Sequence, residues 1–310
     1  VTITLGVSLS WHPLFLQEHE MKVTYLQKYT YTLAKMGYNL CVTGDAGTGK
    51  TFIMNKFIQD MEKDGYNIMK LSATGIAASS IGGVTIHKEF KVPVGPVTNK
   101  VTAYKDTDDA MIETDILVIE ELSMCRVDLF DLVISKVLTA NSIRHRRGHK
   151  SIQIILIGDF FQLPPVLTEY DKKVLDAYYG HDIECGFAFQ SKFWSLLDLK
   201  YVILTDIMRQ TDKEFLTELN KIRVGNKESI DYFYKNSARN VIPDAITLCG
   251  TNSEVDRINN EKLNKIPGDF VEYRAILDGE VNYNDTIAEF NLRLKLGARV
   301  MMLTNSDFYN

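Results

Sequence analysis

The sequence lacks several features that would assign it to a membrane or secreted class. Its 310 residues contain no apolar run near the ~20 residues that span a bilayer, no internal repeat and no low-complexity segment. The first residues, Val1–Leu5, carry neither the basic region nor the small-residue cleavage site of a secretory signal. The four cysteines are widely spaced and form no C-x-x-C pair. We therefore expect no membrane association and a reducing compartment inside the cell, whether cytoplasm, nucleoid or nucleus.

A marked excess of positive charge is also missing. The chain has 35 basic and 40 acidic residues, a net charge of −5, whereas a strongly basic domain is the usual footprint of nucleic-acid binding. This balance does not exclude such binding, because a local groove matters more than the total charge. We interpret the one dense basic cluster, Arg144–Lys150, as a solvated loop before a strand, with a DNA contact as the less favoured alternative.

One segment carries most of the information that is present. The run Gly44-Asp45-Ala46-Gly47-Thr48-Gly49-Lys50-Thr51 fits G-x-x-x-x-G-K-[ST], between a short apolar run and a helical pattern. A strand–loop–helix unit of this kind points backbone N–H groups and the positive helix end at phosphates. Lys50 would reach the β- and γ-phosphates, and the Thr51 hydroxyl would ligate Mg²⁺. The alternative is a chance glycine turn before a core helix. The pattern predicts binding of a nucleoside triphosphate.

Apolar runs and amphipathic helical patterns alternate up to about Asp206. This alternation predicts an α/β fold with a mostly parallel sheet and helices on both faces, with ligands at the carboxyl ends of the strands. A second α/β portion is expected beyond Asp206. The expected strands are 39–43, 67–71, 116–119, 153–157, 202–204, 245–249 and 298–303, and the expected helices include 52–64, 127–138, 212–223 and 252–263.

Two of the expected strands end in side chains suited to ATP chemistry. Glu120 and Glu121 follow the strand at 116–119, so Glu120 is the candidate for Mg²⁺ and Glu121 for the general base. Gln162 follows the strand at 153–157 in a loop stiffened by Pro164 and Pro165, and a glutamine there can orient water at a γ-phosphate. Paired surface acids and an ordinary proline turn are the alternatives.

These motifs, in this order and spacing, resemble the Pif-one family of DNA helicases, a RecD-like branch of superfamily one. The resemblance rests on G-D-A-G-T-G-K-T, I-E-E-L-S-M and G-D-F-F-Q-L-P-P, and it runs from about Tyr25 to Asn305. Four further segments match. Ser72–Ala78 and Gly82–His87 resemble the family's single-strand-contacting motif. Leu204–Gln210 resembles its L-T-x-x-x-R-Q segment, and Thr251–Leu263 resembles the asparagine-rich helix of its second motor domain.

The resemblance implies roles for individual residues. Gln27 stands where the family places an adenine-reading glutamine, and Arg209 where it places an arginine that reaches the γ-phosphate across the domain cleft. Thr74, His87 and Lys88 are the expected contacts to single-stranded DNA. The alternatives are an exposed helix residue for Gln27, a loop histidine with its own partners for His87, and a helix cap for Arg209.

The resemblance also implies a domain plan. A first RecA-like ATPase domain is expected at 22–206 and part of a second RecA-like domain at 207–310, after an N-terminal extension at 1–21. Two departures stand out. The family usually has Asp-Glu where this chain has Glu120-Glu121, and its later H-K-x-Q-G-type motif and second cleft arginine are missing here. We expect the sequence to be a fragment of a longer helicase.

The leading hypothesis is an ATP- and Mg²⁺-dependent DNA helicase that moves five-prime to three-prime on single-stranded DNA and unwinds duplexes or forks, as in DNA repair and recombination. We expect it to be monomeric. One alternative is a truncated module that binds nucleotide and DNA with little hydrolysis, and another is a phosphate-loop ATPase switch that is not a helicase.

Overall fold

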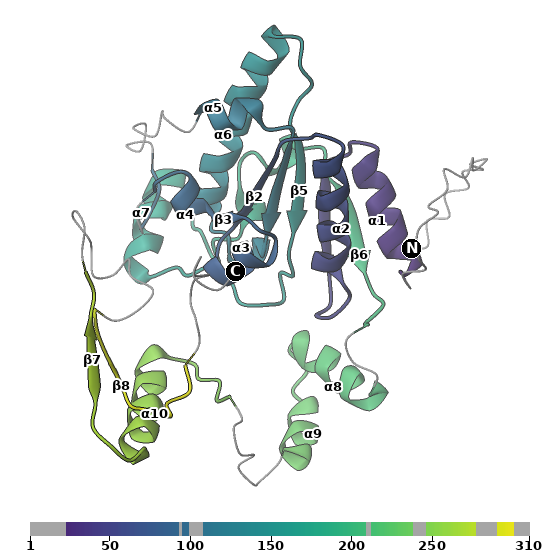
Figure 1. Cartoon of the computed structure of the whole chain (residues 1–310). Coiled ribbons are helices and arrows are strands. Elements are labelled where there is room, and N and C mark those ends of the chain that lie inside the picture. The colour runs from purple at the N-terminus through teal and green to yellow at the C-terminus, as the bar shows by residue number, and fades with distance from the viewer. Residues whose placement is uncertain are drawn as a thin grey trace. The chain divides into compact units, whose positions relative to one another are not determined.

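The computed structural model describes residues 23–92, 95–98, 108–208, 212–237, 246–276 and 290–300. Its centre is a six-stranded sheet in the order β3-β2-β4-β5-β1-β6 (Figure 1). The strands are β1 (Leu40–Gly44), β2 (Ile68–Ser72), β3 (Val84–Thr85), β4 (Ile116–Glu120), β5 (Gln153–Ile157) and β6 (Lys200–Leu204). Every pairing in this sheet is parallel, which confirms the expected sheet type.

Helices cover both faces of the sheet, with α1 (Tyr25–Lys35) and α2 (Lys50–Lys63) over one face and α6 (Val127–Arg146) over the other. The remaining helices up to residue 236 are α3 (Gly75–Ser80), α4 (Ile86–Glu89), α5 (Asp108–Glu113), α7 (Glu169–Tyr179), α8 (Lys213–Arg223) and α9 (Ser229–Asn236), with short 3₁₀ turns η3 (Leu122–Met124), η4 (Ala188–Gln190) and η5 (Trp194–Leu196). No helix in the described part of the chain has the length and apolar character needed to cross a membrane.

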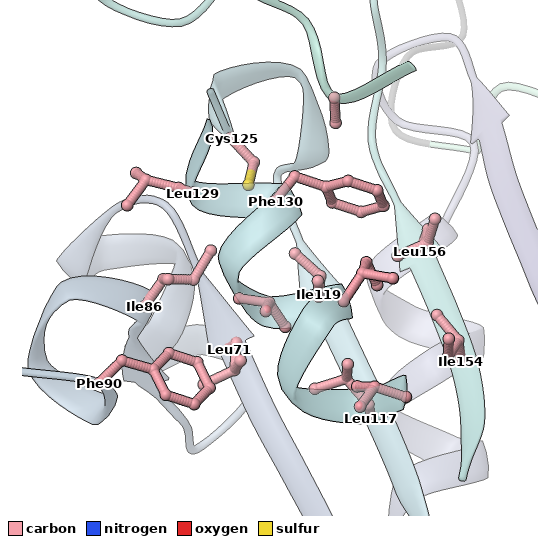
Figure 2. Close-up of a cluster of buried hydrophobic side chains, with 14 of the residues drawn as sticks. Leu71, Ile86, Phe90, Leu117, Ile119, Cys125, Leu129, Phe130, Ile154 and Leu156 are labelled. Carbon is pink, nitrogen blue, oxygen red and sulfur yellow. The ribbon is translucent and has the colours of Figure 1, made fainter. Parts of the chain in front are cut away.

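Strand β4 shows why the sheet needs cover on both sides. All five of its residues are buried, and successive side chains point to opposite faces. Leu117 and Ile119 join a core beneath α6, together with Phe130 and other side chains (Figure 2). Ile116 and Val118 join a second core beneath α1 and α2. A near-continuous apolar run is therefore the correct sequence signature of this central strand.

Helix α6 continues beyond the expected end at residue 138 and reaches Arg146. The interpretation of the basic cluster as a solvated loop is therefore wrong for its first residues. Arg144 is buried, its Nη1 donates to the Ile112 carbonyl at 2.6 Å and its Nη2 pairs with Asp115 at 2.8 Å. Because these partners satisfy its charge, Arg144 extends the helix where the sequence pattern had turned polar.

The chain divides into two compact units, residues 1–232 and 233–310. Helix α8 thus belongs to the first unit, beyond the boundary expected near Asp206, and the division between the units falls within α9. The Met208 amide donates to the Gly47 carbonyl at 2.9 Å. The assignment of 207–310 to a partial second RecA-like domain stays a prediction.

The second unit contains α10 (Asn252–Lys265) and an antiparallel pair, β7 (Val271–Arg274) with β8 (Asn291–Leu294). The strand expected at 245–249 is not formed at the described positions 246–249, where Leu248 is 92% exposed and pairs with no described strand. A strand needs a pairing partner as well as apolar residues. The strand expected at 298–303 is absent at 298–300, and its remainder lies outside the described residues.

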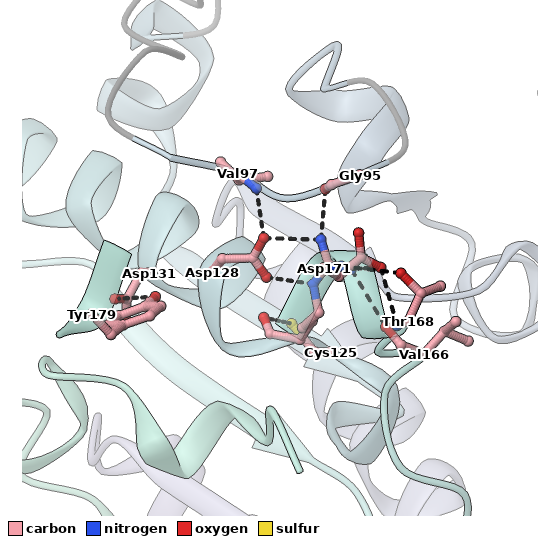
Figure 3. Close-up of polar contacts among 10 residues, drawn as sticks. Gly95, Val97, Cys125, Asp128, Asp131, Val166, Thr168, Asp171 and Tyr179 are labelled. Carbon is pink, nitrogen blue, oxygen red and sulfur yellow. Dashed lines mark hydrogen bonds and ion pairs between the residues drawn. The ribbon is translucent and has the colours of Figure 1, made fainter. Parts of the chain in front are cut away.

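A buried arginine ties the start of α6 to the loop that leads into α7. Arg126 pairs with Asp128 through Nε at 2.7 Å and with Asp171 through Nη1 at 3.3 Å (Figure 3). Its Nη2 donates to the Gly95 carbonyl at 2.6 Å, and its Nη1 to the Val166 carbonyl at 3.4 Å. Because the Asp128 side chain is fully buried, its negative charge depends on this arginine.

Arg126→Leu should lower the free energy of unfolding by about 3–5 kcal/mol, because it leaves a buried carboxylate uncompensated. Urea denaturation followed by tryptophan fluorescence measures this free energy. Trp194 is a suitable probe, because its ring centre lies 5.6 Å from that of Phe130 on α6, the helix that starts directly after Arg126. Arg147→Leu is the matched control. Its pair with Glu113 is exposed and 3.5 Å long, so the loss should stay below about 1 kcal/mol. Equal losses in the two variants would contradict this account of the cluster.

Candidate functional site

The expected phosphate loop joins β1 to α2 in the structure. Gly44, Gly47 and Gly49 all have positive φ, and Gly49 is the left-handed N-cap of α2. A Cβ at Gly44 would lie 2.2 Å from the Leu204 carbonyl oxygen of β6, so a side chain is excluded there by space as well as by conformation. The loop therefore turns tightly over the carboxyl ends of the strands and places the N-terminus of α2 there.

Lys50 lies across the loop. Its Nζ donates to the carbonyls of Gly44 at 2.8 Å and Asp45 at 3.1 Å. Burial lowers its pKa, and the neighbouring carboxylates, Asp159 first, oppose that shift. The ammonium group therefore lies within the loop, where the neighbouring carboxylates offset part of the effect of burial on its pKa.

Gln27 packs beneath the loop and is 2% exposed. Its Oε1 accepts from the Thr24 amide at 3.0 Å, in the capping box of α1, and its Nε2 donates to the Thr48 carbonyl at 2.8 Å. A Cβ at Gly49 would lie 2.4 Å from this Nε2. The structure thus gives Gln27 a direct contact with the phosphate loop, and its role in reading adenine stays a prediction.

Thr51 and Glu120 meet at the carboxyl ends of β1 and β4. The Thr51 hydroxyl donates to Glu120 Oε1 at 2.5 Å, and Oε2 of the same carboxyl is buried without a hydrogen-bond partner. Glu120 is 4% exposed. Burial, assisted by the charge of Glu121 and opposed by the Thr51 bond, raises the pKa of Glu120 from 4.5 to about 7.

These groups fit a hard divalent cation. A hydroxyl and a carboxyl oxygen are adjacent, and the unpartnered Oε2 is a buried oxygen in need of a positive charge. Mg²⁺ typically takes one or two carboxylates plus substrate phosphates and keeps several waters. The described residues contain no group of three or more histidine, cysteine and acidic side chains that could hold a metal by themselves.

Glu121 sits next to this pair in an unusual backbone conformation, with φ 52° and ψ 49°. A non-glycine residue in the left-handed region is uncommon and often marks a functional site. The turn η3 starts directly after it, so the left-handed residue directs the chain away from the sheet edge. Its side chain is partly exposed and lines a groove of about 730 Å³.

Gln162 lines the same groove. Its Nε2 donates to Asp159 Oδ2 at 3.3 Å, and the Phe161 amide donates to Asp159 Oδ1 at 3.1 Å. Asp159 is 1% exposed and also pairs with Arg223 of α8 at 2.5 Å. The same arginine pairs with Asp45 at 2.6 Å. Sequence reasoning missed Arg223, because a charged residue at the end of an amphipathic helix gives no signal of its tertiary partners.

The structure brings most of the predicted residues to one edge of the sheet. The groove connects Thr51, Glu120 and Glu121 to Thr74 and Gln162, and it is mainly apolar. Thr74 is the N-cap of α3, and its hydroxyl accepts from the Ala77 amide at 3.3 Å. The groove is lined by Thr51, Thr74, Ile76, Ala77, Ser80, Glu120, Glu121, Ser123, Met124, Phe161, Gln162, Leu163 and Pro164.

Two of the predicted DNA contacts do not line the groove. His87 and Lys88 are on α4, directly after β3, so they share the sheet edge but are not part of the groove lining. Arg209 lies outside the described residues. Their assigned roles stay predictions.

The parallel sheet, the glycine loop and the acids at the next strand ends define a RecA-like phosphate-loop NTPase. A family model for PIF1-like helicases matches residues 17–231. The chain therefore belongs to the PIF1-like helicase family, which is the family that its motifs resemble.

Individual relatives agree. The ATP-dependent DNA helicase PIF1 of Candida albicans is 34% identical over 91% of this chain, and that of Emericella nidulans is 29% identical over 95% of it. The chain spans 33% and 40% of the lengths of these two proteins.

Solved structures of Pif1 helicases are also similar to this chain. The crystal structure of a Bacteroides Pif1 bound to single-stranded DNA is similar with a TM-score of 0.75 and 29% identity, over 94% of this chain and 67% of that one. A Bacteroides Pif1 in complex with ADP-AlF3 and single-stranded DNA gives 0.73 and 29%, over 94% and 68%.

The raised pKa of Glu120 predicts a pH-dependent stability. Between pH 4.5 and 7 the folded chain keeps a proton on Glu120 that the unfolded chain has released, so this residue lowers stability as pH rises through that window. Glu120→Gln keeps the shape and removes the titration. In the absence of Mg²⁺ the variant should be more stable than the wild type at pH 8, by at most about 3 kcal/mol at ~1.36 kcal/mol per pKa unit, and the gain should shrink toward pH 5.

Urea denaturation in the presence of EDTA at pH 5 and pH 8 measures this difference. Glu113→Gln, an exposed acid at the opposite end of the strands, is the control and should show no such pH-dependent gain. A Glu120→Gln variant less stable than the wild type at pH 8 would rule out the proposed cost of burying the charged carboxylate.

Proposed function

We propose that this chain is part of the motor of an ATP-dependent DNA helicase, which binds Mg²⁺-ATP at the loop 44–51 and single-stranded DNA at the same edge of the sheet. The observation that carries the proposal is the contact between Thr51 and Glu120, with Lys50 and Gln162 beside it. Family membership and the nucleotide and DNA complexes of Bacteroides Pif1 support it.

The residues suggest a division of roles. The N–H groups of the loop and Lys50 would hold the β- and γ-phosphates, as backbone donors and a cation do at the N-terminus of a helix. Thr51 and Glu120 are the groups that would hold Mg²⁺, which neutralises phosphate charge. Glu121 would accept a proton from the attacking water, and Gln162 would orient that water. Arg209 would contribute positive charge at the γ-phosphate.

The groove supplies a physical route from ATP to DNA. It extends from Glu120 and Glu121 to Thr74, the expected DNA contact, and the exposed Phe161 and Leu163 lie along it. Aromatic and apolar side chains suit sequence-tolerant stacking with bases. Movement five-prime to three-prime and unwinding of a duplex or fork are proposed on the family resemblance.

Lys50→Ala should weaken ATP binding about tenfold to a hundredfold, since a charge-assisted contact is typically worth ~1.5–3 kcal/mol. Titration calorimetry with ATP and Mg²⁺ measures the affinity. Lys56→Ala is the matched control, because Lys56 lies on the same helix and pairs with Asp60 at 2.9 Å instead. Unchanged affinity in Lys50→Ala would exclude the loop as the phosphate site.

ATP turnover with and without single-stranded DNA tests the function itself. A motor should hydrolyse ATP faster when DNA is added, and Glu121→Gln should reduce this turnover by ~10²–10⁴-fold while leaving ATP binding intact. Glu62→Gln, an exposed acid paired with Lys70, is the control and should turn over normally. Tight binding of ATP and DNA without turnover would favour the binding-module alternative, and turnover indifferent to DNA would favour the switch.

A further inference from the structure

Arg223 connects two acids that come from different parts of the nucleotide site. Its Nη1 lies 2.6 Å from Asp45 Oδ1 in the phosphate loop, and its Nη2 lies 2.5 Å from Asp159 Oδ1 after β5. The guanidinium also stacks 4.5 Å from the centre of the Phe161 ring. One cation from α8 thus spans the phosphate loop and the loop that carries Gln162.

Each acid has a second task in the site. The Asp45 carbonyl accepts from Lys50 Nζ at 3.1 Å and from the Thr48 hydroxyl at 2.8 Å. The Asp159 carboxylate accepts from Gln162 Nε2. The position of Arg223 therefore affects the conformation of the loop that would surround the phosphates. Through Asp159 it also affects the position of Gln162, which would face the phosphates.

The charge balance shows why a cation is needed here. Four carboxyl groups surround the loop, and Lys50 alone could not offset them. The charge of Arg223 reaches this place, because it is one of the charges that affect Lys50. The four acids are Asp45, Glu120, Glu121 and Asp159. Without Arg223, these carboxyl groups would lose one of the two positive charges, with Lys50, that the described part of the site places beside them.

We propose that Arg223 is a positioning residue of the nucleotide site, which neutralises Asp45 and Asp159 and holds the phosphate loop and the Gln162 loop at the spacing that a nucleoside triphosphate requires. This inference rests on the proposed ATP binding. The fork geometry of arginine matters, because two terminal nitrogens serve two carboxylates and lysine has one nitrogen for both.

A double-mutant cycle on the full chain tests the proposal by calorimetric titration with the non-hydrolysable analogue AMPPCP and Mg²⁺. Arg223→Gln should weaken binding about tenfold or more, because two carboxylates beside the phosphates lose their counter-charge. Asp45→Asn alone should weaken binding less than Arg223→Gln does, because the pair between Arg223 and Asp159 remains. The double variant Arg223→Gln/Asp45→Asn should recover part of the loss, because it removes one of the two uncompensated carboxylates, and a merely structural role of Arg223 would not produce this rescue. Arg223→Lys should bind with intermediate affinity.

Arg257→Gln is the matched control, because Arg257 also bridges two acids, Glu254 and Glu261, but on the exposed surface of α10. It should bind like the wild type. Circular dichroism and urea denaturation establish that each variant is folded. Wild-type affinity in Arg223→Gln, or a double variant no tighter than Arg223→Gln, would overturn this inference alone. A wild-type chain that binds no nucleotide would overturn both this inference and the proposed function.

Discussion

Parallel pairing of β1, β4 and β5 is the constraint on which the site depends. Strand β5 pairs with β1 on one side and β4 on the other, in the same direction and within a few residues of the same register. The loops that follow these strands therefore leave the sheet at the carboxyl ends of the strands, at nearly the same level along the strand axes. Thr51 and Glu120, 69 residues apart in the sequence, meet there. Because both faces of the sheet are packed with apolar side chains, the meeting point is rigid as well as close.

The same edge concentrates negative charge, and the structure compensates for it unevenly. Asp159 is buried but receives an arginine and two further donors. Glu120 is buried with one donor and one unpartnered oxygen, so its pKa rises. This difference matches the two roles proposed above, since a carboxyl with satisfied oxygens can position its neighbours and one with an unpartnered oxygen can take a cation. The side chain of Glu120 reaches the Thr51 hydroxyl directly.

The sequence predicted the parts of this site that local backbone geometry requires. The phosphate loop could be predicted because its three glycines with positive φ occur at a fixed spacing in the sequence. The strands before the loop and before Glu120 could be predicted because they are continuous apolar runs. Tertiary contacts could not be predicted in this way. Nothing in the sequence indicates that Gln27 packs under Thr48, that Arg144 is buried, or that Arg223 returns to the loop. The strand expected at 245–249 failed for a related reason, because strand formation depends on a neighbour that composition does not reveal.

The loop from Asp159 to Thr168 shows how these contacts cooperate. Arg223 holds its first residue through the Asp159 carboxylate, and Arg126 holds its last turn through the Val166 carbonyl and Asp171. Two prolines restrict the backbone between these anchors. Phe161 is 61% exposed and Leu163 72% exposed, and both side chains line the groove. Large apolar side chains on a loop fixed at both ends are held out toward solvent by the fold, which is the arrangement that a surface for bases or for a packing partner requires.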